Sequence, residues 1–149
     1  MKSLLAYKAG PKILGTIREE GLKSERVRVF AGPAGGPKWF VSVGFDKALM
    51  ASRFLENGNR VLLAGSSAGG WRCLAMACKD PLSAYENLRI AYSRNVFTAQ
   101  DTPQTIGAAL GRNVNAFLQD ADIPYILDHP SFDLAVHTVR SRGPAGSEN

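Results

Sequence analysis

The chain of 149 residues has room for one domain with one hydrophobic core, and we treat residues 1–149 as a single domain. Its hydrophobic and charged fractions, 45% and 21%, are those of an ordinary globular protein. The formal net charge of +5 comes from scattered lysines and arginines, which argues against a nucleic-acid-binding protein but is compatible with peripheral contact to an anionic membrane surface.

The two cysteines, Cys73 and Cys78, predict free thiols. They lie five residues apart on one expected helix, so their side chains point in different directions and do not easily form a disulfide. Free thiols are typical of a reducing compartment. The N-terminus lacks the apolar core of a signal peptide, and no run approaches the length of a membrane-spanning helix. We therefore expect a cytoplasmic protein, and the cysteines indicate no metal site.

The first half of the chain predicts a strand, a helix and a second strand in succession. After a short helix from Pro11 to Gly21, residues 26–31 alternate between polar and apolar and predict a strand. A glycine-rich loop leads to a helix at 39–57, and a nearly all-apolar strand follows at 60–64. This succession is typical of a parallel βαβ unit, in which both strands end at the same edge of the sheet.

The second half predicts mostly helices and one further strand. Asp101-Thr102-Pro103 is a strong helix start, and apolar residues recur at helical spacing after it. The expected elements are helices at about 68–78, 82–94 and 103–118, an irregular or single-turn segment at 123–128, a third strand at 132–140 and a loop at 141–149. Together these elements indicate an α/β fold with a mainly parallel sheet.

Ser67 occupies the centre of Gly65-Ser66-Ser67-Ala68-Gly69, which follows an apolar strand and precedes a helix. This arrangement is typical of a nucleophile elbow, a strained turn that exposes a serine hydroxyl. Gly65 and Gly69 suit it because a Cβ would collide where strand and helix approach each other. The alternative is a Gly/Ser-rich turn that binds an anion or merely connects two elements.

The loop at residues 32–38 does not have the pattern of a nucleotide-binding loop. Pro37 precedes Lys38 where a P-loop needs glycine, and Trp39 follows where Ser or Thr should hold magnesium. The Gly-x-Gly-x-x-Gly spacing of dinucleotide-binding folds is also lacking.

The same loop is better suited to donate backbone hydrogen bonds. Gly35 and Gly36 can adopt conformations that aim successive N–H groups at one point. Opposite Ser67, that point is where the oxyanion of an acyl-transfer reaction forms. The alternative is a tight connecting turn.

Together, the two motifs and the helix between them resemble the patatin-like phospholipase family over residues 27 to about 80. This resemblance implies a three-layer α/β/α fold and hydrolysis of lipid acyl esters by a Ser–Asp dyad without histidine. It makes Ser67 the nucleophile and Gly35 and Gly36 oxyanion donors, and it matches Lys38 to the basic residue of the family's Asp-Gly-Gly-Gly-x-Arg/Lys-Gly loop, so we include Lys38 in the oxyanion site. The chain departs from that loop at Pro33, Ala34 and Trp39, which stand where the family has Asp, Gly and Gly.

The dyad aspartate of this family lies in an Asp-Gly-Gly/Ala motif downstream of the serine, and no Asp-Gly occurs here. Asp120, Asp122, Asp128 and Asp133 fit surface, turn or cap positions instead. We therefore expect the Asp beyond this chain, which would make the chain the N-terminal portion of the domain and leave it with little turnover alone.

Two other hypotheses remain. A Ser-His-Asp esterase would use His129 or His137 as its base. A degenerate family member would bind lipid or a protein partner without catalysis. Trp71 and Arg72, just after the elbow, fit packing and solvation better than a substrate pocket. None of the readings calls for a metal or an organic cofactor.

Overall fold

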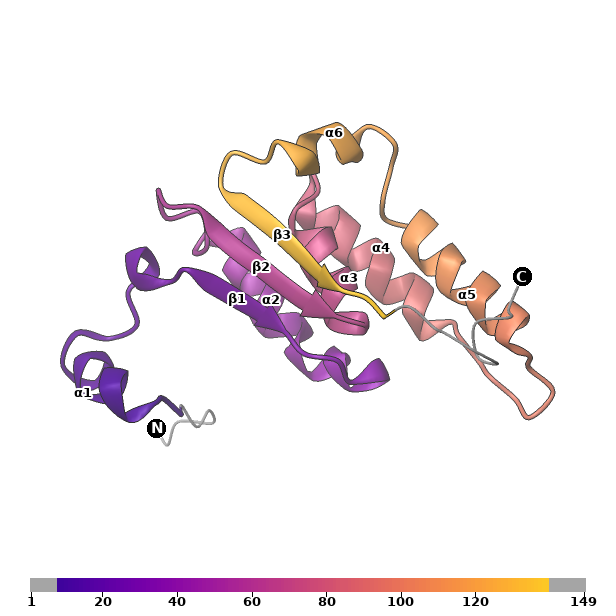
Figure 1. The fold of residues 1–149 in the computed structure, drawn as a ribbon, viewed down its shortest axis with the longest axis horizontal. Coiled ribbons are helices and arrows are strands. Elements are labelled where there is room, and N and C mark those ends of the chain that lie inside the picture. The colour runs from indigo at the N-terminus through magenta and orange to yellow at the C-terminus, as the bar shows by residue number, and fades with distance from the viewer. Residues whose placement is uncertain (1–7, 140–149) are drawn as a thin grey trace.

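A computed structural model describes residues 8–139 and confirms the α/β class. The three strands are β1 (Val29–Gly32), β2 (Val61–Ser66) and β3 (Phe132–His137). They form one sheet in the order β1-β2-β3, and both neighbouring pairs are parallel, as predicted (Figure 1). Because the strands are parallel, the loops that follow them leave from one edge, which we call the carboxyl edge.

The helices agree closely with the expected segments. The structure contains α1 (Pro11–Glu20), α2 (Val43–Ala51), α3 (Ala68–Met76), α4 (Pro81–Ser93), α5 (Pro103–Asn115), α6 (Asp122–Leu127) and two 3₁₀ turns, η1 (Ser24–Arg26) and η2 (Gly36–Ser42). The start of α5 is a capping box in which Thr102 and Thr105 exchange hydrogen bonds between side chain and backbone.

Three elements differ from the prediction. The strand expected at 26–31 begins only at Val29, because Ser24–Arg26 form the 3₁₀ turn η1. The expected helix at 39–57 is divided into η2 and α2, and it ends at Ala51. It ends there because Arg53, with φ of 52°, adopts the left-handed conformation that closes a helix C-terminus. The third strand ends at His137, and the loop expected at 141–149 lies outside the described residues.

The central strand β2 provides the middle of the core. Val61 and Leu63 are fully buried beneath α3, while Leu62 and Ala64, which point to the other face, are only half-buried. Both cysteines are free and buried, as predicted, and burial raises the pKa of the Cys73 thiol to about 11.

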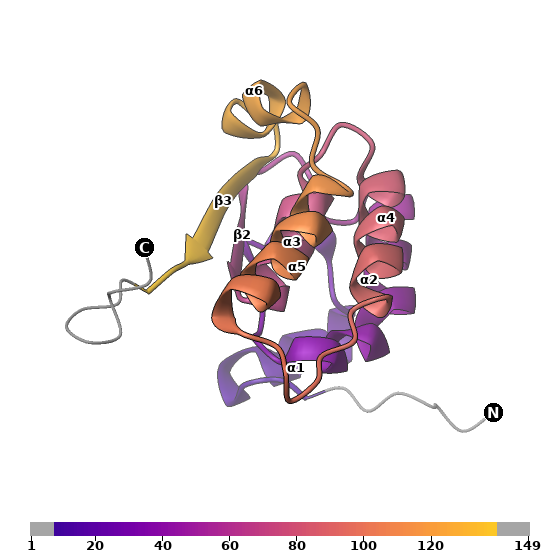
Figure 2. The same ribbon diagram turned by 90° about the vertical axis from the view of Figure 1, so that its right-hand side faces the viewer.

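The helices α2 to α5 lie on one face of the sheet, as Figure 2 shows. On the other face, the side chains of Val29, Ala135 and His137 are exposed, and α1 has no buried residue. Residues 8–139 therefore form two layers, whereas the resemblance implied three. Within the same residues, no helix combines the length and the apolar character needed to cross a bilayer.

Candidate active site

Ser67 lies at the junction between β2 and α3, at the carboxyl edge. Its φ of 52° and ψ of −130° put a non-glycine residue in the left-handed half of the conformational map. The side chain is exposed, and the Ser67 carbonyl accepts from the N–H groups of Gly70 and Trp71. A strained, exposed serine between a strand and a helix has the geometry of a nucleophile elbow.

Three glycines let this turn contact the end of β1. A Cβ added to Gly69 would overlap the carbonyl oxygen of Gly32, and one added to Gly65 would lie 2.5 Å from the Cα of Gly70. The steric reason for Gly65 and Gly69 is thus as predicted. The contact also brings Gly69, the second residue of α3, against Gly32, where the glycine-rich loop begins.

The loop itself offers free backbone donors. Gly36 has a φ of 53°, which favours glycine, and Gly35 and Ala34 are exposed. Within residues 8–139, no acceptor hydrogen-bonds the N–H groups of Ala34, Gly35 or Gly36. The Lys38 N–H differs, because it donates to the Gly35 carbonyl at 3.2 Å. Of the predicted oxyanion residues, Gly35 and Gly36 have backbone donors to offer, and Lys38 has only its exposed ammonium group.

A groove of about 200 Å³ runs beside this loop. Its lining joins the loop to η2 and to α3: Pro33, Ala34, Gly35, Lys38, Trp39, Val41, Ser42 and Arg72. Among these, Arg72 and Trp39 are buried, at 5% and 4% exposure.

Arg72 takes part in a buried polar cluster that sequence reasoning missed. Its Nε and Nη2 donate to the two carboxylate oxygens of Asp46 at 2.8 and 2.9 Å, and Asp46 is fully buried. The Tyr85 hydroxyl also donates to Asp46, and Ser42 Oγ lies 3.2 Å from the same carboxylate oxygen. Burial and the neighbouring Asp46 carboxylate raise the pKa of Tyr85 well above its usual range. We call these four residues the Asp46 cluster.

The two histidines lie at opposite edges of the sheet. His129 precedes β3 and is buried, and its Nδ1 accepts from the N–H groups of Ser131 and Phe132, both at 3.0 Å. Burial lowers the pKa of His129. His137 ends β3 at the carboxyl edge, where it is exposed and in register with Ser66.

None of the four aspartates considered as a base lies at the carboxyl edge. Asp122 is buried and accepts from the N–H groups of Lys79 and Gln119, and Asp133 forms an ion pair with Arg60 at 2.6 Å. Asp128 follows the end of α6, and Asp120 is exposed shortly before it. All four belong to α6, its flanking turns or the first residues of β3, away from the carboxyl edge (Figure 1).

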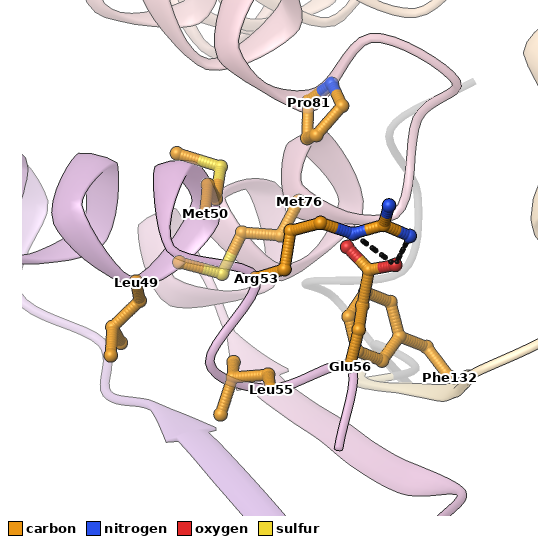
Figure 3. Close-up of a pocket in the computed structure, with 8 residues that line it drawn as sticks. All are labelled: Leu49, Met50, Arg53, Leu55, Glu56, Met76, Pro81 and Phe132. Atoms are coloured by element: carbon orange, nitrogen blue, oxygen red, sulfur yellow. Dashed lines mark hydrogen bonds and ion pairs between the residues drawn. The ribbon is translucent and has the colours of Figure 1, made fainter. Parts of the chain in front are cut away.

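Another pocket lies at the opposite edge, where β3 begins (Figure 3). It is mainly apolar, and an Arg53–Glu56 ion pair with a 2.5 Å contact lies at its side. Its lining residues are Leu49, Met50, Arg53, Leu55, Glu56, Met76, Pro81 and Phe132. Nowhere in residues 8–139 do three His, Cys, Asp or Glu side chains gather closely enough to hold a metal ion.

Comparison of the chain with family models, with curated proteins and with solved structures found no match.

Proposed function

We propose that this chain carries the nucleophile and the oxyanion loop of a serine acyl hydrolase that acts on lipid or other carboxylic esters. The observation that carries the proposal is the strained, exposed Ser67, whose helix start packs against the beginning of a loop with free N–H groups. The motif resemblance to patatin-like phospholipases supports the same reaction. A second helical layer on the exposed face of the sheet would complete the three-layer fold that this resemblance implies.

In this mechanism, Ser67 Oγ attacks the ester carbonyl carbon and loses its proton to a general base. The N–H groups of Gly35 and Gly36, together with the positive end of α3, stabilise the negative charge on the former carbonyl oxygen. The tetrahedral intermediate collapses to an acyl-enzyme as the leaving alkoxide takes the proton from the base and departs as the alcohol. Water, deprotonated by the same base, then attacks the acyl-enzyme, and the acid leaves as Ser67 Oγ regains its proton. The mechanism calls for no metal or organic cofactor.

The resemblance assigns the general base to an aspartate. The four candidate aspartates belong to α6, its flanking turns or the start of β3, away from the carboxyl edge, so none of them is the proposed dyad Asp. A lipid substrate further implies that the carboxyl edge contacts a membrane surface peripherally, and we propose a cytoplasmic location for the protein.

Fluorophosphonate labelling tests this function, because these probes react with activated serines. The folded protein, in the longest form encoded, should be labelled at Ser67. Ser67→Ala should abolish the labelling, whereas Ser66→Ala, one residue earlier in β2, should retain it. An unlabelled wild-type protein would support the non-catalytic binding protein, and labelling that persists in Ser67→Ala would exclude Ser67 as the nucleophile.

A Ser-His-Asp esterase is the second candidate, because His137 lies in register with Ser66, next to the proposed nucleophile. His129 does not fit this role, since it lies at the opposite edge and its Nδ1 already accepts two hydrogen bonds. The variant His137→Gln separates the two mechanisms. The Ser–Asp dyad predicts an unchanged labelling rate, and the triad predicts a loss of several orders of magnitude.

A further inference from the structure

We propose that the Asp46 cluster positions the glycine-rich loop for reaction at Ser67, and that Ser42 is the positioning residue that joins the loop to the cluster. The inference rests on the proposed function. It concerns residues that touch neither the substrate nor the reacting atoms.

The cluster first fixes the helix that carries the nucleophile. Arg72 is five residues beyond Ser67, within α3, and its two hydrogen bonds to Asp46 hold α3 against α2. A bidentate pair restrains orientation as well as distance. Tyr85 adds a third donor from α4, so three helices converge on one carboxylate.

The cluster then reaches the loop through Ser42. This residue ends η2, the 3₁₀ turn that begins directly after Gly35. Its hydroxyl lies 2.7 Å from the Trp39 carbonyl and 3.2 Å from Asp46 Oδ2, so both acceptors are within hydrogen-bond distance of its one proton. Ser42 therefore links the turn that begins at the oxyanion donor Gly36 to the carboxylate that holds α3.

A role in positioning explains why the cluster is charged. Burying an ion pair costs desolvation energy, and apolar residues of similar volume often give equal or greater stability. This pair, however, connects the two elements whose relative placement decides whether the loop N–H groups face the oxyanion. Oxyanion donors act only within a narrow range of distances, so a displacement of about 1 Å can slow the reaction by roughly 100-fold.

The experiment measures the reaction of Ser67 with a fluorophosphonate, with its rate constant at saturation, kinact, separated from the binding constant, KI. In this reaction Ser67 Oγ forms a bond to phosphorus, its proton goes to the base and fluoride leaves. Negative charge grows on the phosphoryl oxygen, so kinact reports how well the loop donors are placed.

We expect Ser42→Ala to lower kinact about 5- to 10-fold, the effect of roughly one hydrogen bond, with KI unchanged. Ser42→Thr keeps the hydroxyl and should restore most of the rate. Ser93→Ala is the matched control, because Ser93 Oγ also donates to the carbonyl three residues earlier, at 2.8 Å, but lies on α4 outside the cluster. It should react like the wild type.

Tyr85→Phe provides a second measurement, because it removes one donor to Asp46 and leaves the Arg72 pair in place. It should also lower kinact without changing KI. Melting temperatures of all variants show whether each is fully folded under the labelling conditions.

The outcomes distinguish the inference from the proposed function. If Ser67 is labelled but Ser42→Ala and Ser93→Ala both react like the wild type, the positioning role is wrong and the proposed function stands. The positioning role is also wrong if Ser42→Thr lowers kinact as much as Ser42→Ala does. It is wrong, too, if the fall in kinact only matches the loss of folded protein. If wild-type Ser67 does not react at all, the proposed function fails and the inference fails with it.

Discussion

At the scale of single residues, Gly69 makes the closest backbone contact between the two motifs. A Cβ at this position would overlap the Gly32 carbonyl oxygen, which belongs to the backbone and cannot rotate away. We expect Gly69→Ala to lower the free energy of unfolding by about 1 to 3 kcal/mol, because the start of α3 must move away from β1. The same movement should slow fluorophosphonate labelling of Ser67. Urea unfolding and labelling kinetics measure the two effects.

Gly111 is the matched control for this variant. It also lies in a helix, α5, but nothing in the structure is within 4 Å of the position that a Cβ would occupy. Gly111→Ala should raise the free energy of unfolding by about 0.5 to 1 kcal/mol through helix propensity alone. Equal effects of the two substitutions would refute the close approach at Gly69.

The residues of the candidate site differ in how far the sequence could predict them. The elbow geometry at Ser67 was open to prediction because such a turn is local, with strand, turn and helix adjacent in the chain. The pairing of Asp46 with Arg72 spans 26 residues and depends on which faces of two helices meet. Its one signal is a charged residue within an otherwise apolar helical stretch, as at Arg72 between Trp71 and Cys73. That signal does not identify the partner.

At the scale of elements, the junction between α6 and β3 depends on a neutral histidine. His129 Nδ1 accepts two backbone N–H groups and so carries no proton in the folded protein. Burial lowers its pKa below the value of 6.5 that it has when unfolded. Above pH 6.5, His129 is neutral in the folded and in the unfolded protein, so its titration does not lower the free energy of unfolding. As the pH falls below 6.5, the unfolded chain binds the proton first, so the folded state loses stability.

We therefore expect the free energy of unfolding to fall as the pH is lowered from about 7.5 to about 5.5, and His129→Asn to reduce this fall. An asparagine side-chain oxygen can still accept a hydrogen bond but does not titrate. Urea unfolding at both pH values measures the difference. Because the carboxylates are the same in both proteins, their contribution cancels in the comparison. An identical pH dependence would show that His129 does not titrate on unfolding.

The elements themselves followed largely from the sequence. Strands and helices with clear apolar periodicity, such as β2 and α5, lie where they were expected. The helix expected at 39–57 differs from the structure, because its apolar spacing continues where the backbone changes from η2 to α2 and again where α2 ends. The change at Arg53 could not be predicted, since a left-handed helix end usually has glycine there.

At the scale of the whole molecule, the two edges of the sheet have different contents. The carboxyl edge carries the elbow, the glycine-rich loop and His137, whereas the opposite edge carries the apolar pocket of Figure 3 and the buried His129. Parallel sheets place their sites at the carboxyl ends of the strands, so we assign chemistry to the first edge and stability to the second.

This division predicts that stability and reactivity can be changed separately. Met50 is half-buried, lines the pocket in Figure 3 and belongs to the end of α2 that is remote from the elbow. Met50→Ala should lower the free energy of unfolding by about 1 to 2 kcal/mol, below the 2 to 5 kcal/mol typical of a fully buried methionine. The loss comes from apolar contacts and not from movement of the loop.

The labelling rate of Ser67 in Met50→Ala should equal that of the wild type when both proteins are fully folded. Gly69→Ala is the contrasting variant, because it should lower stability and labelling rate together. Unfolding curves first establish a temperature at which each variant is folded, and labelling is then compared at that temperature. A slower reaction of folded Met50→Ala would show that the two edges are coupled, because a cavity at one edge would then disturb the loop at the other. Equal rates would place the determinants of reactivity at the carboxyl edge, where β1 and β2 end.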